Sequence, residues 1–365
     1  MKFFSPLLKS VLYPGLASAG YFKRRVLAGD LCVLTYHGVL PNGYKSNDAV
    51  LDGHLVSADN LRAQLRLLKA RYKVISFKEA LPCFEFEGRI PQRSVLLTCD
   101  DGLQNVLTDM LPILQEEAVS CLFFITGAST SDRVSMLWYE ELYLLLMSAG
   151  NGLVTFPDLK LAAKLGDQQQ KRLLWWKWVN ELSCHDAEVR HAFLKSLAEQ
   201  CGLPENWKLP YETGVAKSRF CLMTAKEVRE LAGAGMEIGA HTMSHPMLAQ
   251  CSAELVWEEM TRSREALASL LGEPVRAMAY PFGDPGSAGK REFETAERAG
   301  YKYAFLNFGG TFGPSGTFGP SFSRFAIPRV HVTSDMSLSE FEAHVSGFHQ
   351  ALKQRFGRQD ARPCA

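Results

Sequence analysis

Two adjacent carboxylates, Asp100 and Asp101, follow directly after the apolar run "SVLLTC" of residues 94–99. Apolar runs of this length that end at turn residues are typical of buried strands. Like charges this close repel each other, and burying either one is unfavourable unless it is paired or binds a metal. The pattern therefore indicates a metal site at the end of a strand, with a capped turn or a salt-bridged pair as the alternative.

His241 and His245 offer nitrogen ligands for such a site, four residues apart in "HTMSH". This spacing places two side chains on one face of a helix, but Pro246 disfavours helical geometry at His245, so we expect a turn or a short helical start there. The motif holds no glutamate, so a general base must come from elsewhere. Two histidines and one aspartate leave metal positions open for water, and the second aspartate is then free to accept a proton.

Further polar residues follow, or lie in, other apolar runs. His37 comes after "CVLTY", Phe282 lies in the "PFG" that follows "VRAMAY", and the last such run carries Arg329 and His331. In parallel α/β barrels, active sites form at the carboxyl ends of the strands. We therefore expect these residues to converge with the aspartates and histidines above, although they are far apart in the sequence.

Strand-like and helix-like segments alternate along most of the chain, which predicts a parallel sheet covered by helices. The helix at 57–72 places Leu61, Leu65 and Leu68 on one face, with Ser57 as its N-cap. Thr224 likewise caps the helix at 224–235. The expected strands are 31–39, 73–77, 94–101, 120–126, 236–240, 275–283, 301–306 and 324–332, and the other expected helices are 107–118, 252–272, 290–300 and 338–356.

Residues of about 130–220 interrupt this alternation with long helical segments and predict an inserted helical subdomain. The insert carries five of the six tryptophans. We expect Trp175, Trp176 and Trp178 to pack the insert, with a carbohydrate-stacking platform as the alternative. Later in the chain, the tandem repeat "GTFGPSGTFGPS" of residues 310–321 predicts a duplicated loop insertion, because glycine and proline at these positions favour turns over core.

The composition is that of a globular protein with a sizeable core: 365 residues, 47% hydrophobic and 22% charged. A net charge of +1 argues against nucleic acid as a general partner. Nine scattered cysteines without a CxxC pair fit reduced thiols in a cytoplasmic protein better than a disulfide framework. Residues 1–28 form an apolar and basic segment, which we interpret as retained and resting on a membrane surface. A cleaved signal peptide and a core-packing arm are the alternatives.

The motifs "TCDDG", "HTMSH" and "YPFG", in this order, resemble those of the polysaccharide deacetylase family, also called NodB-homology or carbohydrate esterase family 4. "LTYHGV" and "IPR" resemble the subgroup that is found in gene clusters for bacterial surface polysaccharides. The resemblance covers residues of about 30–130 and 220–335. It implies an α/β fold, a distorted (β/α)7 barrel over 29–345 with the helical insert, followed by a helix end and tail at 346–365.

The resemblance also implies roles. Asp101 would bind a divalent metal together with His241 and His245, most simply Zn²⁺, with Co²⁺, Ni²⁺ or Mn²⁺ as alternatives. Asp100 would be the general base, and the backbone N–H of Phe282 would help to form the oxyanion hole.

Three departures from the family pattern affect these roles. Cys99 replaces the usual phenylalanine, which we interpret as a packing change. Ala279 stands where an arginine usually orients the base, so we expect Arg329 or Arg324 to substitute. The tryptophan-containing fourth motif is not evident.

The late histidine of the family is also displaced in this chain. We favour His37 as the acid that protonates the leaving amine, with His331 as the alternative. The expected activity is therefore metal-dependent removal of acetyl groups from N-acetylated sugars of a bacterial surface glycan or its lipid-linked precursor, in the cytoplasm or at the membrane surface. The rival functions are hydrolysis of other linear amides on the same fold and a non-catalytic sugar-binding scaffold.

Overall fold

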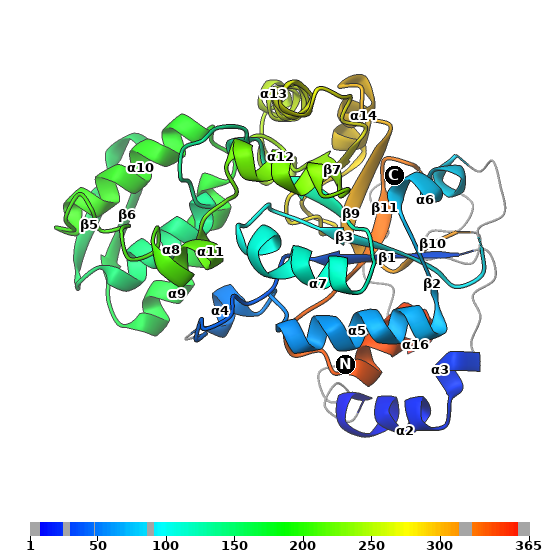
Figure 1. The fold of residues 1–365 in the computed structure, drawn as a ribbon. Coiled ribbons are helices and arrows are strands. Elements are labelled where there is room, and N and C mark those ends of the chain that lie inside the picture. The colour runs from blue at the N-terminus through cyan, green and yellow to red at the C-terminus, as the bar shows by residue number, and fades with distance from the viewer. Residues whose placement is uncertain (1–7, 25–29, 47, 86–90, 314–322, 357–365) are drawn as a thin grey trace.

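Seven parallel strands pair edge to edge into a closed barrel in the computed structural model, which describes residues 8–24, 30–46, 48–85, 91–313 and 323–356 (Figure 1). The pairing runs β1-β11-β9-β8-β7-β4-β3, and β3 pairs with β1 to close the ring. The predicted (β/α)7 barrel is confirmed. Its strands are β1 (Leu31–Tyr36), β3 (Ser94–Cys99), β4 (Leu122–Ile125), β7 (Glu237–Ala240), β8 (Ala277–Ala279), β9 (Tyr303–Gly309) and β11 (Ile327–His331).

Two short strands extend the sheet outside the ring. β2 (Lys73–Ile75) pairs in parallel with β3, and β10 (Thr311–Phe312) pairs antiparallel with β1. Most of the predicted duplicated loop at 310–321 lies outside the described residues.

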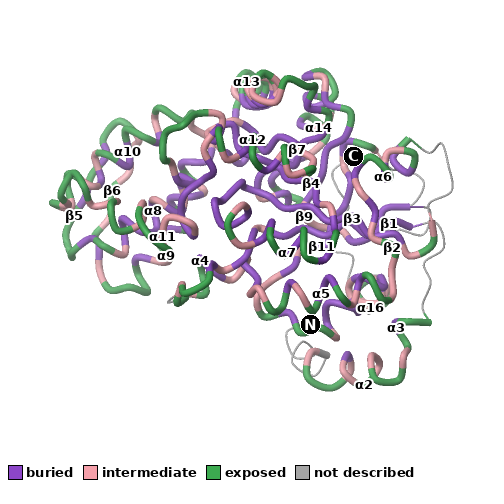
Figure 2. The backbone as a smooth tube through the Cα atoms, in the orientation of Figure 1, coloured by how far each residue is buried: buried purple, intermediate pink, exposed green. Residues whose placement is uncertain are grey.

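The barrel strands are apolar on both faces because each face meets a different core. In β1, Leu31 and Val33 join a cluster made mainly by the other strands, whereas Cys32 and Leu34 join the larger cluster that includes the outer helices. This alternation is expected of a strand that is covered on both sides. The buried strands and more exposed outer helices are visible in Figure 2.

Helices cover the outside of the barrel, and the predicted caps are present. The Ser57 side chain accepts from Asn60 N, and Thr224 forms a capping box with Glu227. The closing helix predicted at 338–356 is instead two helices, because Gly347 adopts a φ of +68° between them. The covering helices are α5 (Ala58–Arg71), α7 (Leu111–Glu116) after the π-helix η2 (Val106–Met110), α12 (Ala225–Gly233), α13 (Ala253–Leu271), α14 (Lys290–Arg298), α15 (Leu338–Val345) and α16 (Phe348–Phe356). Two shorter helices lie elsewhere: α4 (Ala49–Asp52) contributes Leu51 to the cluster of the insert, and α6 (Phe77–Phe84) contributes Phe77 and Phe84 to the cluster of the barrel strands.

The described N-terminal residues form η1 (Leu8–Leu12), α2 (Tyr13–Ser18) and α3 (Tyr21–Arg24), which pack against the C-terminal helices (Figure 1). Tyr13 and Phe22 are buried with Ala343, and the Tyr13 hydroxyl lies 2.6 Å from His349 Nδ1. Residues 1–7 and 25–28 of the predicted N-terminal segment lie outside the described residues. Among the described helices, none combines the length and apolarity that crossing a bilayer requires.

The insert, defined here as residues 131–220, projects to one side of the barrel (Figure 1). It contains α8 (Trp138–Ser148), α9 (Gln168–Leu182), α10 (Ala187–Gln200) and α11 (Gly214–Phe220). An antiparallel hairpin that the sequence did not predict, β5 (Gly152–Phe156) and β6 (Leu161–Leu165), joins α8 to α9. The insert has a core of its own, in which Trp178 is buried against Phe156 and Phe193.

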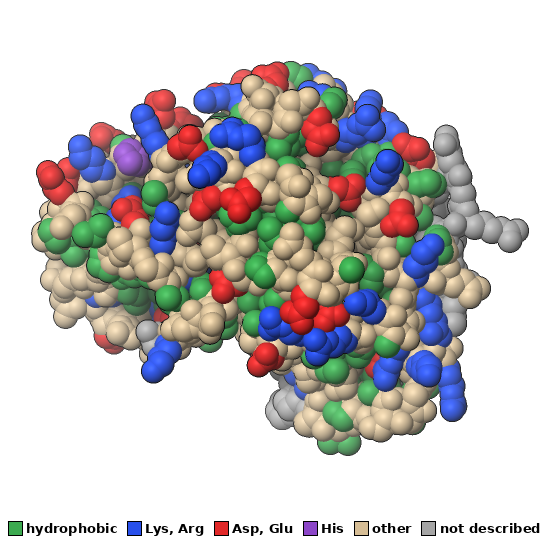
Figure 3. All heavy atoms as spheres, viewed as in Figure 1, with side chains coloured by type: hydrophobic (Ala, Val, Ile, Leu, Met, Phe, Trp, Pro, Cys, Tyr) green, Lys and Arg blue, Asp and Glu red, His purple; other side chains and the backbone are tan. Residues whose placement is uncertain are grey.

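Charges of both signs are mixed over the molecular face in Figure 3. Over α5 and α7, for example, Arg62 and Arg66 pair with Glu116, and Lys69 pairs with Glu117. Interspersed charge of this kind agrees with the near-zero net charge and forms no basic stripe on this face.

Candidate active site

A cavity of about 280 Å³ lies at the carboxyl ends of the barrel strands, where they meet the insert. It gathers seven of the eight site residues predicted from the sequence, and the eighth, Arg329, contacts Asp100 directly. Residues separated by almost 300 positions therefore converge at one place. The lining residues are His37, Val50, Leu51, His54, Asp100, Asp101, Tyr139, Glu140, Trp175, Trp176, His241, His245, Phe282, Asn307 and His331.

Asp101, His241 and His245 form a buried trio that could hold a metal ion. Each offers one ligand atom, and these atoms all lie within 4.8 Å of one another. Asp101 Oδ1 lies 3.4 Å from the Nε2 atoms of both histidines. His241 Nδ1 lies 2.8 Å from the carbonyl oxygen of Ala279, which orients the ring with Nε2 toward Asp101.

The chemistry of this trio fits a divalent cation. Within the described residues, neither carboxylate oxygen of Asp101 accepts a hydrogen bond, although both are buried. Burial raises the pKa of Asp101, but the two imidazoles outweigh it and hold that pKa well below its usual value. An ionised, buried carboxylate without a hydrogen-bond donor, facing two imidazole nitrogens, is the arrangement that a bound metal completes.

Left-handed backbone conformations gather at this site. Seven described residues other than glycine have a positive φ, and four of them are Asp101, Thr242, His245 and Phe282, with φ between 57° and 75°. Such conformations are disfavoured for residues with a side chain and persist where the surroundings enforce them. At Asp101 the φ of 75° breaks the alternation of the strand, so that both aspartates line the cavity. The predicted turn at His245 is present, with no helix.

Arg329 holds the second aspartate. Its Nη1 and Nη2 atoms donate to the two carboxylate oxygens of Asp100 at 2.7 and 2.6 Å, and both side chains are almost fully buried. Arg329 is itself fixed, since it also donates to Leu306 O and Thr98 Oγ1 at 2.7 and 2.9 Å. Burial raises the pKa of Asp100, but the arginine charge and hydrogen bonds, with nearby His241, hold that pKa below its usual value.

Asp100 therefore has a cationic partner although position 279, where the sequence resemblance implies an arginine, is alanine. Ala279 has no cationic group, and Arg329 on β11 contacts Asp100 from inside the barrel. Arg324, the other candidate, lies on the surface, 3.5 Å from Glu297. Of the two arginines that the sequence suggested, only Arg329 is within reach of Asp100.

Three further imidazoles lie close together at the cavity. The ring centroid of His37 lies 4.9 Å from that of His331 and 5.4 Å from that of His54. Burial lowers the pKa of all three, that of His331 to about 3. His37 and His331 both line the cavity. Either one is therefore placed where the general acid that protonates the leaving amine must lie. His54 was not predicted, because it lies in a loop with no strand end or spacing to mark it.

The "YPFG" turn leaves a backbone donor free. Among the described residues, none accepts a hydrogen bond from the Phe282 N–H, and Phe282 lines the cavity with its ring 5.0 Å from that of His245. Gly283 next to it has a φ of 63°, and a Cβ there would lie 2.5 Å from Asn307 N. Only glycine fits this position, which fixes the turn that presents the Phe282 N–H.

The tryptophans of the insert divide between the two expected roles. Trp178 is buried in the insert core, and Trp175 is buried with its indole N–H donating to Tyr139 O at 2.7 Å. Trp176 is 51% exposed and lines the cavity. Packing therefore describes the first two, whereas Trp176 has the exposed aromatic surface that a stacking platform needs.

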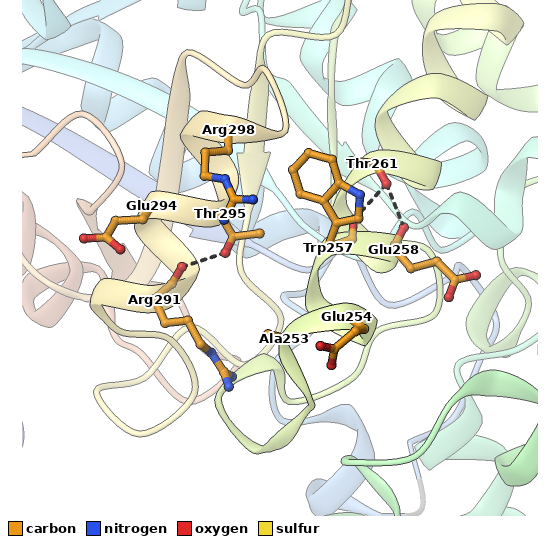
Figure 4. Close-up of a pocket in the computed structure, with 9 residues that line it drawn as sticks. All are labelled: Ala253, Glu254, Trp257, Glu258, Thr261, Arg291, Glu294, Thr295 and Arg298. Atoms are coloured by element: carbon orange, nitrogen blue, oxygen red, sulfur yellow. Dashed lines mark hydrogen bonds between the residues drawn. The ribbon is translucent and has the colours of Figure 1, made fainter.

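A second hollow, on the outer surface between α13 and α14, contains none of the predicted site residues (Figure 4). Trp257 and Arg298 face each other there, with the guanidinium carbon 5.4 Å from the indole ring. No histidine or cysteine lines it, and the charged residues are of both signs. The hollow is lined by Ala253, Glu254, Trp257, Glu258, Thr261, Arg291, Glu294, Thr295 and Arg298.

Comparison with known proteins finds a family that part of the chain resembles. A family model described as polysaccharide deacetylase matches residues 176–304, which include His241, His245 and Phe282. A chitooligosaccharide deacetylase of Sinorhizobium fredii (strain NBRC 101917 / NGR234) is 31% identical over 99 residues. Over this part of its length the chain is similar to the polysaccharide deacetylase family. The aligned part is 27% of this chain and 44% of the relative, so the chain spans less than half of that relative's length.

Solved structures of deacetylases share the fold of this chain. The Streptococcus pyogenes deacetylase PplD in complex with acetate is 16% identical, with a TM-score of 0.54 over 87% of this chain and 99% of that one. IcaB from Ammonifex degensii is 18% identical, with a TM-score of 0.52 over 87% of this chain and 97% of that one. At this level of identity the similarity establishes the fold.

Proposed function

We propose that this protein is a metal-dependent N-deacetylase that removes acetyl groups from N-acetylated sugars of a bacterial surface glycan or its lipid-linked precursor. One observation carries the proposal: the trio of Asp101, His241 and His245 lies beside a second aspartate, Asp100, that Arg329 holds ionised. The match of residues 176–304 to the polysaccharide deacetylase family model supports the acetylated sugar as substrate. The exposed Trp176 at the cavity supports a saccharide, because sugar rings stack on aromatic faces.

Asp101, His241 and His245 would hold the ion, and Zn²⁺ suits two nitrogens and one carboxylate oxygen best. When bound, a divalent ion supplies Lewis-acid polarisation of the acetyl carbonyl and of water. The chain's own residues supply the proton transfers. Asp100 accepts a proton from the attacking water, and Arg329 keeps its carboxylate ionised and oriented.

The remaining roles fall to the two other groups at the cavity. The Phe282 N–H, free of any protein acceptor among the described residues, donates to the oxyanion that forms when water adds to the carbonyl. His37 donates a proton to the sugar nitrogen, so that the C–N bond breaks and acetate leaves. Because burial lowers the pKa of His37, the imidazole is neutral at rest and must first receive that proton. The proton that Asp100 takes from water is the available source.

The test is acetate release from N-acetylglucosamine oligomers and lipid-linked sugars, with zinc and with a chelator. We expect about one zinc ion per chain, release that the chelator abolishes, and a loss of at least about 100-fold in Asp100→Asn. Asp100→Asn should still bind zinc, whereas Asp101→Asn should not. Equal release by Asp100→Asn and wild type would refute the mechanism, and release only from non-sugar amides would replace the substrate class.

A further inference from the structure

The loop that carries both histidine ligands is held from two sides. This loop, residues 241–247, is called the His loop here. From the barrel side, the N–H groups of Gly127 and Ala128, which follow β4, donate to Thr242 O and Met243 O at 2.8 and 3.1 Å. A Cβ at Gly127 would lie 2.3 Å from the sulfur and 3.0 Å from the Cα of Met243, so a larger residue there would require the Met243 side chain and the loop to shift.

Glu259 on α13 binds the same loop from a second barrel element. Its Oε2 atom accepts from Met243 N and Ser244 N, each at 2.8 Å, and its Oε1 atom accepts from the Ser244 hydroxyl. Glu259 is buried, so its charge needs a partner. The three donors of the His loop compensate this buried charge.

The insert supplies the third set of contacts. Trp138 at the start of α8 donates its indole N–H to His245 O at 3.0 Å. Arg190 on α10 donates to Ser244 O at 3.2 Å and to the Ser244 hydroxyl. Its guanidinium also lies 5.0 Å from the Trp138 ring centroid. Arg190 and Glu259 thus meet at Ser244, and two consecutive carbonyls of the His loop are held by insert side chains.

These contacts fall on the strained part of the loop. Thr242 and His245 both have a positive φ, near 60°, and conformations of this kind persist only where neighbours enforce them. A ligand whose backbone is free to relax away from that conformation presents its nitrogen to a metal less often, so the metal binds more weakly. Contacts to Ser244 and His245 are therefore contacts that maintain the metal site.

We infer that the insert helps to maintain the metal site: Trp138 and Arg190 are positioning residues that hold the His loop in its metal-binding conformation. The inference rests on the metal site of the proposed function. It gives the helical insert a role beyond lining the cavity, since zinc affinity depends on its docking against the barrel. It equally follows that bound zinc stabilises the docked insert, because the two equilibria are linked.

The test compares the zinc affinity of Trp138→Phe with that of wild type by competition with a chromogenic chelator. The change removes one N–H and keeps an aromatic ring. We expect the zinc Kd to rise about tenfold or more, with turnover recovered at saturating zinc. Amide hydrogen exchange of residues 241–247 should become faster in the zinc-free variant.

Trp175→Phe is the matched control, because it too removes an indole N–H from the insert, but one that donates to Tyr139 O. Its zinc Kd should change less than about threefold. Should Trp138→Phe fail to fold, Arg190→Met tests the same loop through Ser244. An unchanged Kd and unchanged loop exchange in the variants overturn the inference. Absence of zinc binding in wild type instead overturns the proposed function. In that case, amide hydrogen exchange of residues 241–247 still tests whether the insert holds the loop: faster exchange in the variants supports this role, and unchanged exchange overturns it.

Discussion

The contact between Arg329 and Asp100 can be broken at one end by Arg329→Met, which keeps a long apolar side chain and removes the charge. Arg329 makes four hydrogen bonds, two of them to Asp100. Both side chains are nearly inaccessible to water, with 0% and 2% of their surface exposed. Asp100 would be left as a buried carboxylate without its cation.

The expected loss follows from this burial. Removing one partner of a buried ion pair destabilises a protein by about 3–5 kcal/mol, because the remaining charge is uncompensated. The Thr98 hydroxyl and the Leu306 carbonyl lose a partner as well, which keeps the expectation at the upper part of that range. Turnover should fall about 100-fold, since the base is no longer held in place.

The assay is urea unfolding followed by tryptophan fluorescence, in chelator so that metal binding does not contribute to stability. Arg324→Met is the matched control, because Arg324 is exposed and lies 3.5 Å from an exposed glutamate. It should change the free energy of unfolding by less than about 0.5 kcal/mol. A loss below about 1 kcal/mol in Arg329→Met, with turnover near wild type, would refute the role of Arg329.

Three further predictions concern the cavity and the His loop. His37→Gln should lower kcat for acetate release about 100-fold and His331→Gln less than tenfold; the reverse order would assign the acid role to His331. Trp176→Ala should raise KM for N-acetylated oligosaccharides about fivefold, which corresponds to roughly 1 kcal/mol of stacking. Trp257→Ala in the outer hollow should leave that KM unchanged, and equal effects would remove the stacking role of Trp176. Gly127→Ala should lower the free energy of unfolding by about 1–3 kcal/mol in urea, because its Cβ meets the His loop; an unchanged midpoint would contradict that close approach.

Most of the barrel could be predicted from the sequence because its signals are local. Apolar runs that are buried on both faces mark the strands, and side chains such as Ser57 and Thr224 mark the helix starts. Asp100 and Asp101 were predicted to lie together with the histidines because parallel strands bring their carboxyl ends to one rim. The hairpin at 152–165 carried no such signal, since the apolar Leu153 lies on its exposed face and breaks the alternation expected of a half-buried strand.

The rest of the site depends on tertiary placement that spacing does not encode. Trp138 and Arg190 reach the His loop from helices of the insert, and they read in the sequence as ordinary helix residues. His54 enters the cavity from a loop, and Asn307 enters it from β9, one residue beyond the strand that the sequence predicted. From the sequence, Arg329 was the predicted site residue and Arg324 the other possible cation for Asp100. Only the barrel geometry shows which of them is inside.

The position of Arg329 has a consequence for how relatives of this chain are compared. Side chains from several strands of a closed barrel point toward the same small volume, so a cation lost from β8 can be replaced by one on β11 without moving the base. A replacement of this kind removes the arginine from its motif, yet the aspartate keeps a cationic partner. A chain that lacks the usual arginine should therefore be judged inactive only when no strand delivers a cation to its aspartate.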